Sequence, residues 1–113
     1  MSDNSNAGLL RIFVGEHDRV HGRPLYEWII LQAKTAGLAG ATAVRGSMGF
    51  GPHSKVIHSF KIEHLALDLP IIVELIDGQD RLRAFLDTIR PNLPADLLAT
   101  LQPVERLRIQ VVP

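Results

Sequence analysis

Two segments with a strong preference for β-structure each precede a segment with the periodicity of an amphipathic helix. Strands are expected at residues 9–15, LLRIFVG, and at residues 70–77, PIIVELID, where apolar and β-branched side chains predominate. Apolar residues then recur at helical spacing in residues 24–37, and again at steps of three and four in residues 80–93. This repeated strand–helix order restricts the chain to folds in which helices cross over one sheet.

Two further strands are expected to complete the pattern. Residues 41–46, ATAVRG, follow the first helix, and residues 104–112, VERLRIQVV, alternate apolar and polar side chains. Asp77 or Asp80 is expected to cap the second helix. The order βαββαβ with right-handed crossovers predicts an α+β fold, a ferredoxin-like split βαβ sandwich. An antiparallel sheet then carries both helices on one face.

Both faces of the two clearest strands are predicted to be apolar. The first strand places Leu10, Ile12 and Val14 on one face and Leu9 and Phe13 on the other, and the second alternates in the same way. Antiparallel sheets with one solvated face normally alternate apolar and polar residues, and two helices cover only one face. The bare apolar face therefore predicts a closed oligomer that packs sheet against sheet.

The composition limits the partners of the chain. Its 113 residues are 46% hydrophobic and 21% charged, as expected of one soluble domain, with residues 1–8 as a disordered tail and residues 9–113 as the domain. Twelve basic residues balance twelve acidic ones, so no overall field attracts nucleic acid or anionic lipid. Without a signal peptide or a membrane-spanning apolar run, the chain is expected to be cytoplasmic, with neither membrane insertion nor a nucleic-acid partner.

Residues 46–51, GSMGFG, contain three glycines immediately after an expected strand. Successive backbone N–H groups in a glycine-rich turn can bind an anion, because glycine allows unusual dihedral angles and close approach of a ligand. Arg45 and Lys55 flank this segment and would neutralise a phosphate. The alternative is a turn or bulge that only redirects a strand.

Metal binding and catalysis have weaker support. His53 and His58 follow the glycines, and zinc commonly takes histidine together with carboxylate, but no secure spacing orients these two residues. The absence of cysteine excludes disulfides, thiolate metal sites and a cysteine nucleophile. Glu16, His17 and Asp18 stand together at a strand end, but no serine has the context of a nucleophile, so no enzyme activity is expected. Glu74 is expected to pair with an arginine, Arg11, across neighbouring strands.

Three stretches of the sequence together resemble the domain-of-unknown-function family 190, a PII-like family related to the PII signal-transduction proteins. They are LRIFVGEHDRVHGRPLYEWI, AGATAVRGSMGFGPHSKVIHS and LDLPIIVELID, and the resemblance extends over about residues 9–112. In PII proteins a GFGRQKG-type turn forms the base of a flexible loop, and residues 45–55, RGSMGFGPHSK, stand in that place.

The resemblance implies a regulatory homotrimer with ligand clefts between neighbouring subunits. In PII proteins these clefts take adenine nucleotides, and the loop, here about residues 47–64, contacts a partner protein. A metal-binding trimer similar to the divalent-cation tolerance proteins, which share the architecture, is the alternative. The ligand-binding residues expected on this resemblance are Arg45, Gly46, Gly49, Phe50, Gly51, Lys55, Arg106 and Arg108, the last two in place of the basic residues that hold phosphate in PII.

Overall fold

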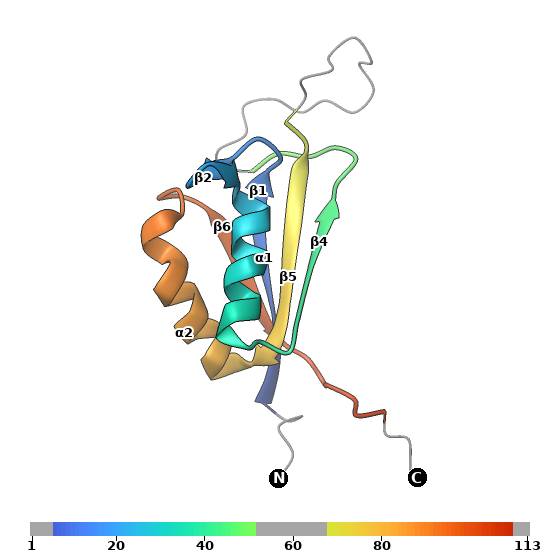
Figure 1. The fold of residues 1–113 in the computed structure, drawn as a ribbon. Coiled ribbons are helices and arrows are strands. Elements are labelled where there is room, and N and C mark those ends of the chain that lie inside the picture. The colour runs from blue at the N-terminus through green and yellow to red at the C-terminus, as the bar shows by residue number, and fades with distance from the viewer. Residues whose placement is uncertain (1–5, 52–67, 110–113) are drawn as a thin grey trace.

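A computed structural model describes residues 6–51 and 68–109 of the chain (Figure 1). Two helices cover one face of a four-stranded sheet, and a two-stranded hairpin precedes the first helix. In chain order the elements are β1 (Ala7–Gly15), β2 (Arg19–Val20), β3 (Arg23–Pro24), α1 (Leu25–Ala36), β4 (Gly40–Arg45), β5 (Pro70–Gly78), α2 (Gln79–Ile89), the 3₁₀ helix η2 (Arg90–Asn92) and β6 (Leu98–Pro103).

The sheet has the strand order β4-β5-β1-β6, and all its neighbouring strands are antiparallel. The two longest strands, β1 and β5, lie at its centre and pair along their whole length, from Ala7 opposite Gly78 to Gly15 opposite Pro70. Each helix crosses over the sheet between two strands that are parallel to each other, which is the split βαβ arrangement. The predicted ferredoxin-like sandwich is therefore confirmed.

The hydrophobic core lies between the sheet and the two helices. Its strand residues are those that the alternation placed on one face, and its helix residues come from the two predicted apolar stripes. The buried members are Leu10, Ile12 and Val14 of β1, Ile71, Val73 and Leu75 of β5, Leu25, Ile29 and Ala33 of α1, and Leu82, Phe85 and Ile89 of α2.

The opposite face of the sheet carries no helix within the described residues; in Figure 1, α1 lies in front of the strands and α2 lies beside it on the left. Four apolar side chains form a row across all four strands of this open face: Val44, Ile72, Phe13 and Leu98. The two at the sheet edges, Val44 and Leu98, are 46% and 41% exposed. The prediction that both sheet faces are apolar therefore holds for this row.

A polar row lies beside the apolar row on the open face. Arg11 donates from Nε to Glu74 Oε2 at 2.9 Å and from Nη1 to Gln102 Oε1 at 2.9 Å. The predicted cross-strand pair of Arg11 and Glu74 is thus confirmed. Its charges are paired within the chain, so the pair can lie at an interface without leaving a charge unmatched.

The last strand lies earlier in the sequence than predicted. β6 pairs with β1 from Leu98 opposite Phe13 to Pro103 opposite Gly8, and residues 104–109 lie outside the sheet. The reason is geometric, because η2 returns the chain to the end of β1 that carries Phe13. Pairing therefore begins at Leu98 and reaches the other end of β1 at Pro103. The alternation in residues 104–109 is real, but within the described residues no strand pairs with this stretch.

The expected cap of the second helix is also wrong. α2 follows Gly78 and has no side-chain cap, so neither Asp77 nor Asp80 serves as one. The buried Asp77 accepts instead from the backbone N–H of Gly78 at 2.6 Å and of Ala39 at 2.9 Å, and from Arg81 Nη1 at 2.9 Å. Asp77 therefore joins the end of β5 to the residue before β4 and to the first turn of α2.

The small hairpin of β2 and β3 was not predicted. Its two-residue connection consists of His21 and Gly22, with φ angles of 50° and 80°. Positive φ at both positions is typical of the type I′ turn that connects two-residue hairpins. The sequence showed only a polar loop here, because strands this short have no measurable alternation.

Candidate functional site

The glycine-rich segment, residues 46–51, leaves the sheet where β4 ends and lies beside the start of β5. Gly46 donates its backbone N–H to the carbonyl of Pro70 at 2.7 Å. A Cβ atom on Gly46 would lie 2.9 Å from Cγ of Pro70, and one on Gly49 would lie 3.3 Å from the same atom. Close packing against Pro70 therefore accounts for the absence of a side chain at these two positions.

The remainder of the glycine-rich segment is open. Between described residues, no backbone hydrogen bond involves the N–H groups of residues 47–51. Two large apolar side chains of the segment, Met48 and Phe50, are 52% and 69% exposed. The segment thus presents backbone donors and an exposed aromatic ring next to each other. Lys55, the second basic residue predicted beside the glycines, lies outside the described residues, as do His53 and His58.

Arg45 is the last residue of β4 and directly precedes the glycine-rich segment. It lies opposite Ile71, on the side of the sheet that faces the helices. Its Nη2 lies 2.8 Å from Oε2 of Glu16, and the Arg45 and Glu16 side chains are 54% and 24% exposed. Because β5 lies between β4 and β1, this ion pair spans the first residues of β5. The cation predicted to attract an anion is therefore already paired within the chain.

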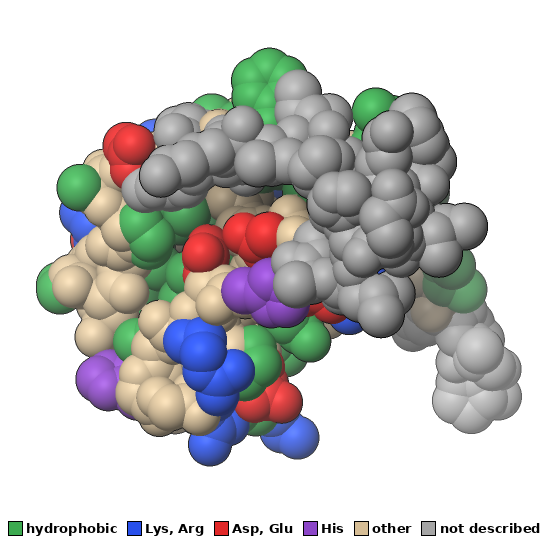
Figure 2. All heavy atoms as spheres, turned by 90° about the horizontal axis from the view of Figure 1, so that it is seen from above, with side chains coloured by type: hydrophobic (Ala, Val, Ile, Leu, Met, Phe, Trp, Pro, Cys, Tyr) green, Lys and Arg blue, Asp and Glu red, His purple; other side chains and the backbone are tan. Residues whose placement is uncertain are grey.

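The turn at residues 15–18 connects β1 to the hairpin and contacts the start of β5 through its backbone. Glu16 donates its backbone N–H to the carbonyl of Leu69 at 2.8 Å, and His17 donates to Oδ1 of Asp68 at 2.8 Å. Asp18 Oδ2 accepts the backbone N–H of Gly15 at 2.8 Å. Seen from above in Figure 2, acidic side chains and a histidine meet in the middle of this end of the molecule.

The acidic residues of the 15–18 turn lie close together in the sequence, but no motif there indicates a binding role. Their adjacency at a strand end was visible, yet the contact between Glu16 and Arg45 depends on which strand lies between β1 and β4. A signal did exist in the sequence, because Asp68 and Pro70 mark the start of a strand and so place a second polar group at the same sheet end.

Arg106 and Arg108 are not close to the glycine-rich segment within one chain. Both side chains are exposed and follow β6, which ends next to Gly8 at the start of β1. The glycine-rich segment instead leaves beside Pro70, which pairs with the other end of β1 (Figure 1). The two groups of predicted ligand residues lie at opposite ends of the sheet, so a shared site would need two copies of the chain.

Metal-ligating side chains do not cluster in the part of the chain that the structure describes. Within residues 6–51 and 68–109, no group of three or more His, Cys, Asp and Glu residues could hold a metal ion. The two histidines proposed for the metal-binding alternative are in the undescribed range. No helix of the described ranges is long and apolar enough to cross a membrane.

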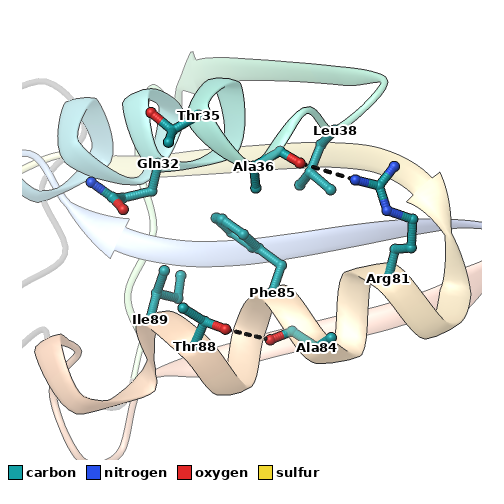
Figure 3. Close-up of a pocket in the computed structure, with 9 residues that line it drawn as sticks. All are labelled: Gln32, Thr35, Ala36, Leu38, Arg81, Ala84, Phe85, Thr88 and Ile89. Atoms are coloured by element: carbon teal, nitrogen blue, oxygen red, sulfur yellow. Dashed lines mark hydrogen bonds between the residues drawn. The ribbon is translucent and has the colours of Figure 1, made fainter.

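A groove of about 350 Å³ lies between α1 and α2, with Phe85 directed into it from α2 (Figure 3). Arg81, at one end, donates from Nη1 to Asp77 and from Nη2 to the carbonyl of Ala36 at 2.9 Å. Thr88 donates its hydroxyl to a backbone carbonyl of its own helix at 3.0 Å. The guanidinium of Arg81 and the hydroxyl of Thr88 are thus already bound to groups of the protein itself. We therefore assign no ligand to this groove.

Comparison with known proteins supports the family resemblance. The family model DUF190, described as "Uncharacterized ACR, COG1993", matches residues 7–106. A UPF0166 protein of Aquifex aeolicus (strain VF5) is 38% identical over 97 residues, which cover 86% of this chain and 90% of that protein. A UPF0166 protein of Methanocaldococcus jannaschii is 31% identical over 80 residues, or 71% of this chain and 72% of that protein.

The solved structures show the same fold at low sequence identity. CPII, a nitrogen regulatory PII-like protein from Thiomonas intermedia K12 bound to ADP, AMP and bicarbonate, superposes with a TM-score of 0.61 and 16% identity, covering 92% of this chain and 96% of CPII. CPII bound to ADP and bicarbonate gives a TM-score of 0.56 and 20% identity, over 88% of this chain and 89% of the other. At this identity the comparison establishes the PII-like fold.

Proposed function

Because this chain belongs to the DUF190 family and has a PII-like fold, we propose that it is a regulatory protein that binds an adenine nucleotide. The nucleotide occupies clefts between the subunits of a homotrimer. Its binding is communicated to a partner protein through the loop at about residues 47–64, of which the structure describes residues 47–51. The protein acts by binding and not by catalysis.

The open sheet face supports the homotrimer. A row of apolar side chains crosses all four strands of this face, and its two outer members are more than 40% exposed in the single chain. A contiguous apolar surface of this kind marks an interaction site, and association through it removes the surface from water. Closed point-group symmetry is the usual result when identical chains associate.

The glycine-rich segment is the part of the chain best suited to a nucleotide, and it carries the proposal. Phe50 exposes 69% of its surface next to backbone N–H groups that make no hydrogen bond to described backbone groups, and Arg45 immediately precedes them. Aromatic rings stack on bases, and arginine with backbone N–H groups binds phosphate. The structures of CPII with ADP and AMP support the choice of adenine nucleotides.

Isothermal titration calorimetry and thermal-shift measurements with ATP, ADP, AMP and cyclic AMP, each with and without bicarbonate, would test the proposal. Bicarbonate belongs in the panel because a solved structure of CPII has it bound together with ADP. Binding of at least one nucleotide at one site per chain is expected. If no nucleotide shifts the melting temperature or releases heat, the proposed function is wrong.

The variant Arg45→Ala is expected to weaken nucleotide binding by about tenfold or more, because a charge-assisted hydrogen bond to phosphate is lost. Calorimetric titration of the best-bound nucleotide would measure this loss. Arg23→Ala is the matched control, since Arg23 is also about half exposed and also pairs with a glutamate, Glu27. Equal losses in both variants would contradict a specific role for Arg45.

A further inference from the structure

We propose that Glu16 sets the nucleotide affinity of this chain by competing with the ligand's phosphate for Arg45. This inference rests on the proposed function and deepens it, because it names a residue outside the glycine-rich segment that controls the same site. The ligand class is an adenine nucleotide with a charged phosphate. The observation that carries the inference is the 2.8 Å ion pair between Arg45 and Glu16.

The ion pair places a negative charge where the ligand's negative charge must come. A phosphate in contact with the Arg45 guanidinium would lie close to the Glu16 carboxylate, and two like charges at such a distance repel each other. The Glu16 side chain is only 24% exposed, so water screens this repulsion less than at an open surface. A bound phosphate therefore has to displace the carboxylate from Arg45. The free energy needed to break the ion pair makes the binding free energy less favourable, so the affinity is lower.

The position of Glu16 does not depend on its own side chain. Its backbone N–H is held by Leu69 and that of His17 by Asp68, the two residues that lead into β5. The 15–18 turn therefore stays on the start of β5 when the ion pair opens. What changes is Arg45, the residue next to the glycine-rich segment, which exchanges a contact with this turn for a contact with the ligand.

Through this exchange of contacts, ligand binding changes the interactions at the end of β4. Without ligand, the end of β4 is joined to the 15–18 turn by the side-chain contact across β5, and to β5 by the bond from Gly46 to Pro70. With ligand, the side-chain contact is broken and the phosphate holds Arg45. The two states differ in a specific contact, as a ligand-induced shift between conformations requires.

The variant Glu16→Gln tests the competition, because glutamine keeps the shape of the side chain and removes its charge. We expect it to bind ADP and ATP about two- to fivefold more tightly than the wild type, which corresponds to the usual contribution of a partly exposed ion pair. Adenosine, which has no phosphate, should bind both proteins equally. Calorimetric titrations at low and high salt would measure the change, which should be larger at low salt.

Two controls separate competition from other effects. Asp18→Asn removes one negative charge from the same turn without touching Arg45, and asparagine can still accept the N–H of Gly15. It should leave the affinity nearly unchanged. In an Arg45→Ala background, the gain from Glu16→Gln should be smaller, because no ion pair remains to be broken and only the direct repulsion between Glu16 and the phosphate is relieved.

The outcomes separate this inference from the proposed function. If the wild type binds a nucleotide and Glu16→Gln does not tighten it, the competition is wrong while the nucleotide function stands. Equal gains in Glu16→Gln and Asp18→Asn would also overturn it, because the effect would then be one of general charge. If no variant binds any nucleotide, both the function and the inference fail.

Discussion

Leu98→Asp should convert the proposed homotrimer into a folded monomer. Leu98 ends the apolar row of the open face, and an aspartate there would place an unpaired carboxylate in the interface that we propose. Burying such a charge costs several kcal/mol of free energy, which is more than a single side-chain contact between subunits contributes. Light scattering after size-exclusion chromatography should show the mass falling from that of three 12.5 kDa chains to that of one.

The structure offers a matched control in Leu31→Asp. Leu31 lies on α1 and is 41% exposed, the same exposed fraction as Leu98, so the two substitutions add the same charge at equally accessible leucines. Leu31→Asp should leave the mass unchanged, and circular dichroism should show both variants folded. A monomeric wild type, or dissociation of both variants, would refute the open face as the interface.

Asp77→Ala is expected to lower the free energy of unfolding by about 2–3 kcal/mol, because three donors lose their shared acceptor. The N–H groups of Ala39 and Gly78 become unsatisfied in a part-buried site, whereas Arg81, 55% exposed, can turn to water. For a chain of this size, such a loss lowers the melting temperature by about 10 °C. Urea denaturation followed by circular dichroism would measure it.

Asp80→Ala is the control for helix-terminal charge. Asp80 is exposed in the first turn of α2, where an acidic side chain favours the helix dipole, and its removal should cost about 0.5 kcal/mol. Comparable losses in the two variants would mean that Asp77 acts only through its charge near the helix. A large difference would show that its hydrogen bonds to β4 and α2 carry the effect.

Most of the fold was predictable because its signals are local. Alternation in β1 and β5 placed Ile12 and Val73 together with their neighbours on one apolar face, and the helical stripe included Leu82 and Ile89; the structure buries all four. These patterns arise from periods of two and 3.6 residues, which a short stretch of chain displays without reference to any other. The order of the elements then left few topologies to consider.

The last strand could not be located in the same way. Residues 98–103 and residues 104–112 follow each other, and the second stretch has the clearer alternation of apolar and polar side chains. Which stretch pairs was decided by the position at which η2 returns the chain to β1 and by the length of β1 itself. The same error placed Arg106 and Arg108 on a strand face, whereas they follow the sheet.

For the candidate site, the chain order alone identified the glycine-rich segment and the neighbouring Arg45, because glycine content and adjacency are properties of a short stretch. The packing of Gly46 against Pro70 and the pairing of Arg45 with Glu16 depended on the tertiary structure. These contacts join positions more than twenty residues apart in the sequence, and they form only because β5 lies between β4 and β1. Local periodicity thus predicts which residues are buried, while strand order decides which charges meet.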